Sequence, residues 1–345
     1  MRTNAANGQA EARRASGDLQ DLIKAYQISQ AIHVAAVLGV ADQMAAGLRA
    51  SDEIAAAVGA HPRTLYRLLR ALAALGVFRE HEHRRFSLTA MGECLRSDAE
   101  RSVRPSAIYL GQTYRWQAWG HLLHSVKTGE NAFRALHGVD TWTYRKRHPE
   151  QDAIFNAAMT ANSRRVDRAI VVACDFSGCA RIADIGGGQG SLLAAILAAY
   201  PEACGVLFDL PHVVATAAPV LEAAGVGNRC EVVGGSMLES VPEGCAAYVM
   251  KFILHDWDDA DCIRILRNCR RAMRSDARLL VIERLVGPPN EDLTVKLSDL
   301  NMLVGPGGQE RTREEFAALF EAGGLRLADV LSTRADMSVI VGEPA

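Results

Sequence analysis

The stretch "ARIADIGGGQGSLLAAILAAY", residues 180–200, joins a short apolar run to an apolar helical segment through a glycine-rich turn. Glycine suits such a turn because the backbone must bend sharply and let a ligand approach without interference from a Cβ atom. Four similar apolar runs follow, separated by helical segments: "CGVLFDL", "CEVVGG", "AAYVMKFIL" and "ARLLVIERLV". This alternation predicts an α/β fold with a parallel, doubly wound, Rossmann-like sheet.

The end of the chain departs from this rhythm. Two apolar runs, "LRLADVLST" and "MSVIVGE", are separated by a short turn with no helical segment between them. A short connection joins antiparallel strands, whereas parallel strands need a long crossover. We therefore expect an antiparallel hairpin at the end of the sheet.

The first third of the chain has a different, mainly helical pattern. Helical runs between residues 18 and 75 precede "VFREHEHRRFSLT", which has the apolar ends and charged middle of a two-stranded hairpin. This order predicts a mainly α winged-helix domain. We divide the chain into a disordered arm (1–17), the winged-helix domain (18–104), a helical connector (105–165) that holds three of the four tryptophans, and the sheet domain (166–345).

Composition limits the function further. The 345 residues are 49% hydrophobic and carry a formal net charge of −2, so the overall charge does not attract nucleic acid or an anionic membrane. No apolar run approaches the ~20 residues of a membrane span, and the N-terminus lacks a signal peptide's apolar core. Eight cysteines form no C-x-x-C pair, which favours small buried side chains over a metal site. We expect a cytoplasmic protein without metal.

The glycine-rich turn indicates which ligand the sheet binds. Asp209 ends the next strand, about 20 residues on, where an acid commonly binds a ribose. Asp184 precedes the first glycine, and Ser191 stands where a dinucleotide fingerprint has its third glycine. An acid at the turn would repel a pyrophosphate but would attract the ammonium group of a methionine moiety. The pattern therefore favours S-adenosyl-L-methionine (SAM), with S-adenosyl-L-homocysteine as product, over a nicotinamide dinucleotide.

A family resemblance rests on a series of motifs in a fixed order. "DIGGGQG", "FDLP", "VGGSM", "MKFILHDWDD", "VIER" and "GPGGQERT" resemble those of SAM-dependent O-methyltransferases of the caffeic-acid and hydroxyindole type, including bacterial members that act on secondary metabolites. The likeness covers about residues 20–343. It implies a methyltransferase sheet, a winged-helix dimerisation domain and a homodimer.

The resemblance also implies the cofactor residues. Asp209 would bind the ribose, Met237 would lie beside the adenine, and Ser163 would lie near the methionine carboxylate. Ser236 stands where the family commonly has an aspartate, so a hydroxyl replaces the usual carboxylate and we expect weaker SAM binding. The full expected set is Ser163, Asp184, Gly186, Gly188, Gly190, Asp209, Leu210, Gly235, Ser236, Met237, Lys251 and Phe252.

His255 is the expected general base. A phenol with a pKa near ~10 is protonated at pH 7, and a neutral imidazole with a pKa near ~6.5 can take its proton as the oxygen attacks. Glu283 and Glu310 match the two family carboxylates that flank this histidine. Asp256 ranks below both, because neighbouring residues on an extended chain point to opposite sides. The strand "MKFIL" is expected to deliver His255 directly to the ligand-binding edge of the sheet.

Flat and polarizable side chains indicate a planar aromatic acceptor with a hydroxyl group. Positions matching Met159 and Met302 flank the acceptor ring in the family, and the two asparagines are candidates to orient its polar groups. The full expected set is Trp116, Phe133, Met159, Asn162, Trp257, Asn301 and Met302.

Two other interpretations remain open at this point. A relative of the family could keep SAM but have diverged to hydroxylase-like or pericyclase-like chemistry. A winged-helix regulator that senses SAM and binds DNA is the second alternative, because Arg63, Arg67 and Arg70 share one face of a helix. The acidic residues of the same domain weigh against it.

Overall fold

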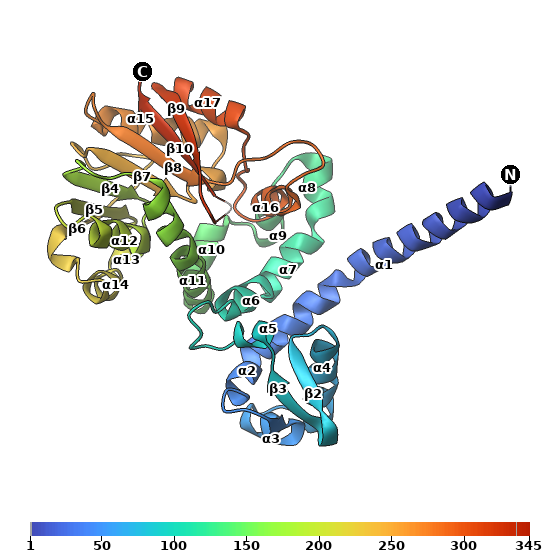
Figure 1. Cartoon of the computed structure of the whole chain (residues 1–345). Helices are drawn as coiled ribbons and strands as arrows, with labels where there is room; N and C mark the ends of the chain where they lie inside the picture. Colours follow the sequence, from blue (N-terminus) through green and yellow to red (C-terminus); the bar gives the residue numbers. More distant parts are fainter. Residues whose placement is uncertain (1, 336) are drawn as a thin grey trace. The chain divides into compact units, whose positions relative to one another are not determined.

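The computed structural model describes the backbone of residues 2–335 and 337–345 and the side chains of 14–163, 166–335 and 337–345 (Figure 1). The chain divides into two compact units, Met1–Trp116 and Gln117–Ala345. This boundary falls inside the expected connector, so that α6 (Arg104–Leu110) and the start of α7 (Thr113–Gly120) belong to the first unit and the later connector helices to the second.

The first unit has the predicted winged-helix order. A helix pair leads into an antiparallel hairpin, in which Phe78 pairs with Leu88, and a short third strand joins its other side. Leu65, Leu69 and Leu72 share the buried face of the second helix of this pair. The elements are α1 (Arg2–Leu38), α2 (Val40–Gln43), β1 (Arg49–Ala50), α3 (Ser51–Ala57), α4 (Pro62–Ala74), β2 (Phe78–His81), η1 (Glu82–Arg84), β3 (Arg85–Leu88), α5 (Ala90–Glu93), α6 (Arg104–Leu110) and α7 (Thr113–Gly120).

The arm that we expected to be disordered differs from the structure. Helix α1 runs without a break from Arg2, so residues 2–17 continue the helix that begins the winged-helix domain. Alanine and arginine, which are frequent in this segment, are good helix formers, and no proline interrupts them. The aperiodic pattern of apolar residues therefore did not indicate the absence of a helix.

The second unit is built on a seven-stranded sheet with the order β6-β5-β4-β7-β8-β10-β9. Strands β4 to β8 are parallel, and β10 is antiparallel to both β8 and β9, which confirms the predicted terminal hairpin. The order reverses between β4 and β7, where ligands of doubly wound sheets bind. The strands are β4 (Arg181–Ile185), β5 (Cys204–Asp209), β6 (Cys230–Gly234), β7 (Ala247–Lys251), β8 (Arg278–Glu283), β9 (Leu325–Ser332) and β10 (Ser338–Pro344).

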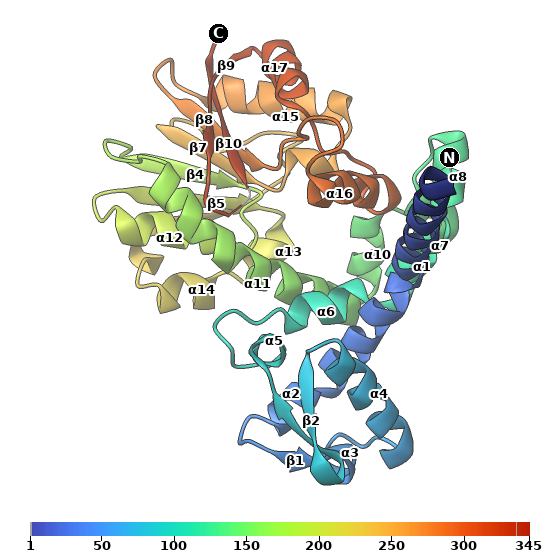
Figure 2. The same ribbon diagram turned by 45° about the vertical axis from the view of Figure 1, so that its right-hand side comes forward.

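Helices cover both faces of this sheet (Figure 2). Apolar residues of α11, α12 and α14 pack on one face, and those of α15 and α17 pack on the other. The helices are α8 (Leu122–Thr128), α9 (Ala132–His137), α10 (Thr141–Arg147), α11 (Pro149–Ala173), α12 (Ser191–Ala199), α13 (Pro211–Val214), α14 (Ala218–Ala223), η2 (Gly227–Arg229), η3 (Leu254–Asp256), α15 (Asp259–Ala272), α16 (Leu293–Val304) and α17 (Arg313–Ala322). Among the described residues, no helix is both long and apolar enough to cross a membrane.

Candidate active site

The glycine loop follows β4 at the point where the strand order reverses. Gly186, Gly188 and Gly190 have φ angles of 70°, 58° and 83°, a region that other residues rarely adopt. A Cβ atom at Gly186 would lie 2.3 Å from Cδ1 of Ile253, which follows β7, whereas nothing lies within 4 Å of one at Gly188. The loop therefore packs tightly against the segment after β7 and leaves its backbone open at Gly188.

Asp209 ends β5 beside the open part of this loop. Its Oδ2 accepts a hydrogen bond from the backbone N–H of Gly188 at 2.8 Å, and its Oδ1 accepts one from Leu210 at 2.6 Å. Burial raises the pKa of Asp209, although these two hydrogen bonds oppose the effect. Met237 lies close on another side, since a Cβ at Gly186 would be 3.2 Å from its Cε. Asp209, Met237 and the glycine loop thus lie together, as expected for a nucleoside site.

Three charged side chains, which we call the cofactor-side cluster, lie next to this loop: Asp184, Asp167 and Lys251. Asp184 is 1% exposed, its Oδ2 has no hydrogen-bond partner in the described part of the chain, and burial raises its pKa to about 7. Lys251, at the end of β7, forms an ion pair with Asp167 of α11. The cluster therefore has two acids and one cation.

Asp167 was not among the expected residues. It lies four positions, or one helical turn, after Ser163 on α11, so the two residues share a helix face. That spacing could have identified it from the sequence. Ser163 itself is partly buried.

The loop and its neighbours fit SAM. The open backbone at Gly188 and the adjacent carboxylate of Asp209 suit a ribose, and the orphaned Oδ2 of Asp184 suits an ammonium group. Gly235 permits close packing on this side, because a Cβ there would lie 2.6 Å from the ring of Phe208.

His255 lies on a turn that follows β7. The strand ends at Lys251, Phe252 has a φ of 57°, and Leu254–Asp256 form a single 3₁₀ turn. The expectation that the strand itself delivers His255 is therefore wrong by four residues. A bulky residue with positive φ is rare and costs backbone energy, which is typical of a functional site. The ring of Phe252 stacks on that of His255 at 5.6 Å.

Glu283, at the end of β8, holds the backbone of this turn. Its Oε1 accepts the N–H groups of Ile253 at 3.0 Å, Leu254 at 2.9 Å and His255 at 3.4 Å. Its Oε2 lies 3.4 Å from Nδ1 of His255. One carboxylate therefore orders the turn and also faces the imidazole ring.

The ring of His255 has a carboxylate on each side. Nδ1 lies 3.2 Å from Oε1 of Glu310, and Nε2 lies 3.7 Å from Oδ1 of Asp256. The argument that ranked Asp256 low is wrong, because the chain is not extended here and the turn brings its carboxylate to the ring. Glu310 is held in turn by the hydroxyl of Ser298 at 2.7 Å and by its own N–H, which donates to Asp299 at 2.9 Å.

We call His255, Asp256, Glu283 and Glu310 the histidine cluster. Burial alone lowers the pKa of His255, but the charges of Glu283, Asp256 and Glu310 outweigh it and raise the pKa to about 10. Burial raises the pKa of Glu283 to about 7 and also raises that of Asp256. Burial raises the pKa of Glu310, but the hydrogen bond and charge of His255, together with the hydrogen bond from Ser298, outweigh burial and lower it. The surrounding acids therefore favour the protonated imidazole, whereas from the sequence we assumed an ordinary histidine pKa.

The same cluster contains the groups best placed to bind a metal in the described part of the chain. One ligand atom from each of His255, Glu283 and Glu310 lies within 4.8 Å of the others. The hydrogen bond between His255 and Glu310 explains this arrangement without an ion.

Arg311 supports the turn from outside and was also missed. It is 1% exposed and donates to the carbonyl oxygens of Leu254 and Trp257, both at 2.9 Å. It also pairs with Asp259 at 2.7 Å. A buried arginine that binds two carbonyls of one turn fixes its shape, and its position directly after Glu310 was the available signal.

The expected acceptor residues occupy different environments. Phe133 is 2% exposed and packs against His137 and Tyr144, which indicates a structural role. Asn301 of α16 accepts a hydrogen bond from the indole N–H of Trp119 at 3.4 Å. Met159 and Trp257 are partly buried, Met302 is buried and Asn162 is exposed. Trp116 belongs to the first unit, where its ring packs on Tyr26.

The chain is similar to known methyltransferases along most of its length. The O-methyltransferase domain matches residues 119–326, and the O-methyltransferase dimerisation domain matches residues 20–98. The phenazine O-methyltransferase PhzM of Lysobacter antibioticus is 43% identical over 98% of this chain and 99% of its own length. The 8-amino-8-demethylriboflavin N,N-dimethyltransferase of Streptomyces davaonensis is 36% identical over 88% of each chain.

A solved structure is similar as well. It is the O-methyltransferase NcsB1 from neocarzinostatin biosynthesis in complex with SAM and 2-hydroxy-5-methyl naphthoic acid, and it superposes with a TM-score of 0.79 at 33% identity, over 92% of this chain and 96% of that one. With a family model that covers more than half of the sequence, the chain belongs to the O-methyltransferase family, whose members are SAM-dependent enzymes.

Proposed function

We propose that this enzyme transfers the methyl group of SAM to a hydroxyl of a planar aromatic secondary metabolite, with His255 as general base. One observation carries the proposal: the buried His255 has its Nδ1 held by Glu310, while its turn packs against the glycine loop through Ile253 and Gly186. A base whose other nitrogen is held by a carboxylate, next to a nucleoside site, suits proton removal from an acceptor beside the cofactor.

The proton balance of the histidine cluster suits a phenol. SAM supplies an electrophilic methyl group on a positively charged sulfur. With a pKa of about 10, His255 matches an ordinary phenol near ~10, so a proton shared between the two is transferred at little cost. The imidazole of the free enzyme is protonated at pH 7. It must therefore lose one proton to solvent before it can accept the proton of a neutral phenol. Nδ1 keeps its proton toward Glu310, and Nε2 exchanges the other with the acceptor.

The aromatic character of the acceptor is supported by the side chains near this site. Trp257 and Phe252 flank the turn that carries His255, and the structure of NcsB1 contains a hydroxylated naphthoic acid. Met159, Met302, Asn162 and Asn301 remain the proposed positions for contacts with the ring and its polar groups.

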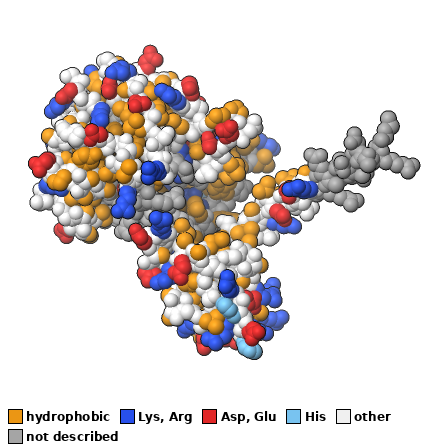
Figure 3. Space-filling model, in the orientation of Figure 1, with side chains coloured by type: hydrophobic (Ala, Val, Ile, Leu, Met, Phe, Trp, Pro, Cys, Tyr) orange, Lys and Arg blue, Asp and Glu red, His pale blue; other side chains and the backbone are white. Residues whose placement is uncertain are grey.

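We also propose that the enzyme is a homodimer. Leu19, Leu22, Ile23 and Tyr26 of α1 are between 56% and 72% exposed, and Figure 3 shows hydrophobic side chains along the described part of this helix. Apolar surface of this extent usually marks an interface, and residues 20–98 match the dimerisation domain. A monomer in sedimentation at micromolar concentration would contradict the proposal.

Labelled SAM tests the proposed reaction. The enzyme is incubated with a panel of phenols, hydroxynaphthoates, anthracyclines and hydroxyphenazines, together with aromatic amines and thiols of the same ring systems. Label is expected in the hydroxylated compounds. Transfer to the amines or thiols alone would rule out O-methylation, and SAM binding without transfer to any compound would favour a relative with diverged chemistry. A gel shift with random DNA duplex at low salt tests the regulator interpretation, and no retardation is expected.

A further inference from the structure

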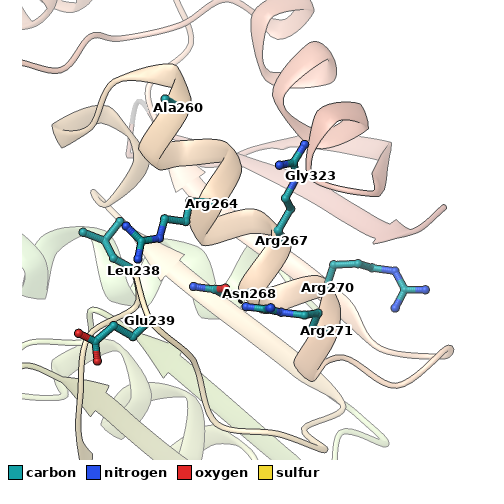
Figure 4. A pocket seen from close by; sticks show the side chains of 9 residues that line it. All are labelled: Leu238, Glu239, Ala260, Arg264, Arg267, Asn268, Arg270, Arg271 and Gly323. Atoms are coloured by element: carbon teal, nitrogen blue, oxygen red, sulfur yellow. Dashed lines mark hydrogen bonds between the residues drawn. The ribbon is translucent and has the colours of Figure 1, made fainter.

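A cavity of about 590 Å³ lies on the α15 side of the sheet, apart from the two clusters described above (Figure 4). Its walls come from the outer face of α15, from Leu238 and Glu239 after β6, and from Gly323 after α17. The cavity is open to solvent, and Arg264, Arg267 and Arg271 on its rim are exposed; its volume is within the range of small-molecule sites. Nothing in the methyl-transfer reaction uses it.

Arginine dominates the lining of this cavity. Arg264, Arg267, Arg270 and Arg271 all contribute to it, and Glu239 is the one acid among the nine lining residues. The whole chain, by contrast, has a net charge of −2. In the part of the chain that the structure describes, none of the four arginines forms an ion pair, whereas nearby Arg274 pairs with Asp276 and Arg311 with Asp259.

The spacing of these arginines is unfavourable without a partner. Arg264 and Arg267 are three residues apart, and Arg267 and Arg271 are four apart, so like charges are neighbours on one helix face. The negative end of the helix dipole accounts for Arg270 and Arg271 in the last turn of α15. Arg267 donates from Nε to the carbonyl oxygen of Ala322, the last residue of α17, at 3.1 Å. Neither interaction accounts for Arg264, which lies further from the end. Figure 4 shows Arg264 directed toward Leu238 and Arg267 toward Gly323.

A buried asparagine connects the floor of the cavity to the cofactor site. Asn268 is 4% exposed, and its side-chain amide donates to the carbonyl oxygen of Met237 at 2.7 Å. Its own carbonyl accepts a hydrogen bond from Arg271. Met237 in turn touches the glycine loop, since a Cβ at Gly186 would lie 3.2 Å from its Cε. A ligand that binds Arg271 would break its hydrogen bond with Asn268 and so alter the hydrogen bond from Asn268 to the carbonyl oxygen of Met237.

We infer that this cavity is a second ligand site, which binds a small molecule with two or more phosphate groups and whose occupancy changes the affinity for the cofactor through Asn268. Guanidinium groups bind phosphate oxygens in pairs of parallel hydrogen bonds, which is why several arginines around one cavity favour polyphosphate over a single carboxylate. The inference goes beyond the proposed function and does not depend on the role of His255.

Pyrophosphate is the probe for the site, because it lacks an adenine that could enter the cofactor site. Titration into the full-length enzyme saturated with S-adenosylhomocysteine should show saturable binding, with a Kd below about 1 mM that rises with salt. The Arg264→Gln/Arg271→Gln double variant should lose about tenfold or more in affinity, since two charge-assisted contacts are removed. Arg274→Gln, which removes a neighbouring arginine outside the cavity, is the matched control and should bind like the wild type.

Two results would overturn the site. One is no saturable binding of pyrophosphate up to about 10 mM, and the other is equal affinity in the wild type and the double variant, with intact folding of both shown by circular dichroism. The coupling has its own measurement. The Kd of S-adenosylhomocysteine should change about threefold or more when pyrophosphate is saturating. Asn268→Asp, which cannot donate to Met237, should abolish the change, and an unchanged Kd in the wild type would refute the coupling.

Discussion

The cofactor-side cluster and the histidine cluster lie at the same edge of one sheet and are built from the same kinds of residue. Both bury carboxylates around a single cation. In the first, the cation is Lys251, which is paired with Asp167, so Oδ2 of Asp184 is left for a cationic ligand group to contact. In the second, the cation is a histidine, which can release its proton. In the function that we propose, the nature of the cation, more than the number of acids, assigns ligand binding to the first cluster and proton transfer to the second.

Removal of the titratable cation should have the largest effect. We expect His255→Ala to lower kcat by at least ~10²-fold, because general-base catalysis is lost. The Kd of S-adenosylhomocysteine, measured by calorimetry, should stay within about twofold, because this residue belongs to the other cluster. His124→Ala on α8 serves as control and should leave both values unchanged. A near wild-type kcat for His255→Ala at pH 7 would contradict the assignment of His255 as the base. Proximity and orientation of the two substrates would then have to account for the rate.

The binding side of the comparison is tested at Asp209. We expect Asp209→Ala to weaken S-adenosylhomocysteine binding by ~1.5–3 kcal/mol, the range for a hydrogen bond to a charged group. The loss includes the hydrogen bond that holds the N–H of Gly188. Calorimetric titration measures the effect, with Glu222→Ala on the exposed side of α14 as control. Unchanged affinity would remove Asp209 from the site.

The pH profile tests the charge of the histidine cluster. The pKa of His255 is raised to about 10, so the imidazole is protonated at pH 7 and loses its proton as the pH rises. For a phenol with a pKa near ~10, kcat/KM should therefore increase about tenfold per pH unit between roughly pH 7 and 9. A profile that is flat above pH 7 would mean that His255 is already neutral there.

The Glu310→Gln variant tests the raised pKa of His255 directly, without a methyl-acceptor substrate. Loss of this negative charge should lower the pKa of His255 by roughly 1 to 2 pH units. The titration of its imidazole in proton NMR, assigned by comparison with His255→Ala, would show the shift. An unchanged midpoint would mean that Glu283 and Asp256 set the pKa on their own.

The smallest expected effect concerns protons at the cofactor-side cluster. Because the pKa of Asp184 is raised to about 7, this carboxyl is half protonated at pH 7. The ammonium of S-adenosylhomocysteine favours the ionised form, so binding should release about half a proton at pH 7 and less as the pH rises. Titrations in Hepes and Tris buffers, which differ in ionisation enthalpy, measure this release. Asp184→Asn should abolish it, and equal release by that variant would assign the proton elsewhere.

Local patterns predicted the regular parts of the fold. The alternation of apolar strands and helices indicated the parallel sheet, and the short turn between "LRLADVLST" and "MSVIVGE" indicated its antiparallel end. The glycine loop and Asp209 were identified because strand, turn and helix are consecutive in the chain. These features depend on interactions between near neighbours, which a sequence displays directly.

The surroundings of His255 depended on the tertiary structure. Alternation along an extended strand placed Asp256 away from the ring, but Glu283 accepts three N–H groups and holds residues 254–256 in a turn. Arg311 binds two carbonyls of the same segment from more than fifty residues away. These long-range hydrogen bonds outweighed the local preference for an extended chain.

By itself, the sequence determined the family and the order of the elements, and it singled out His255 as the candidate base, since each motif consists of residues close together in the chain. Only the tertiary structure decided how those residues are charged. The pKa of His255 depends on its burial and on acids from three separate segments, and the pKa of Asp184 is raised because the fold buries its carboxyl group, an effect that outweighs the nearby charge of Lys251. Electrostatic energy depends on distance in space and on exclusion of water, neither of which is encoded at any single position of the chain.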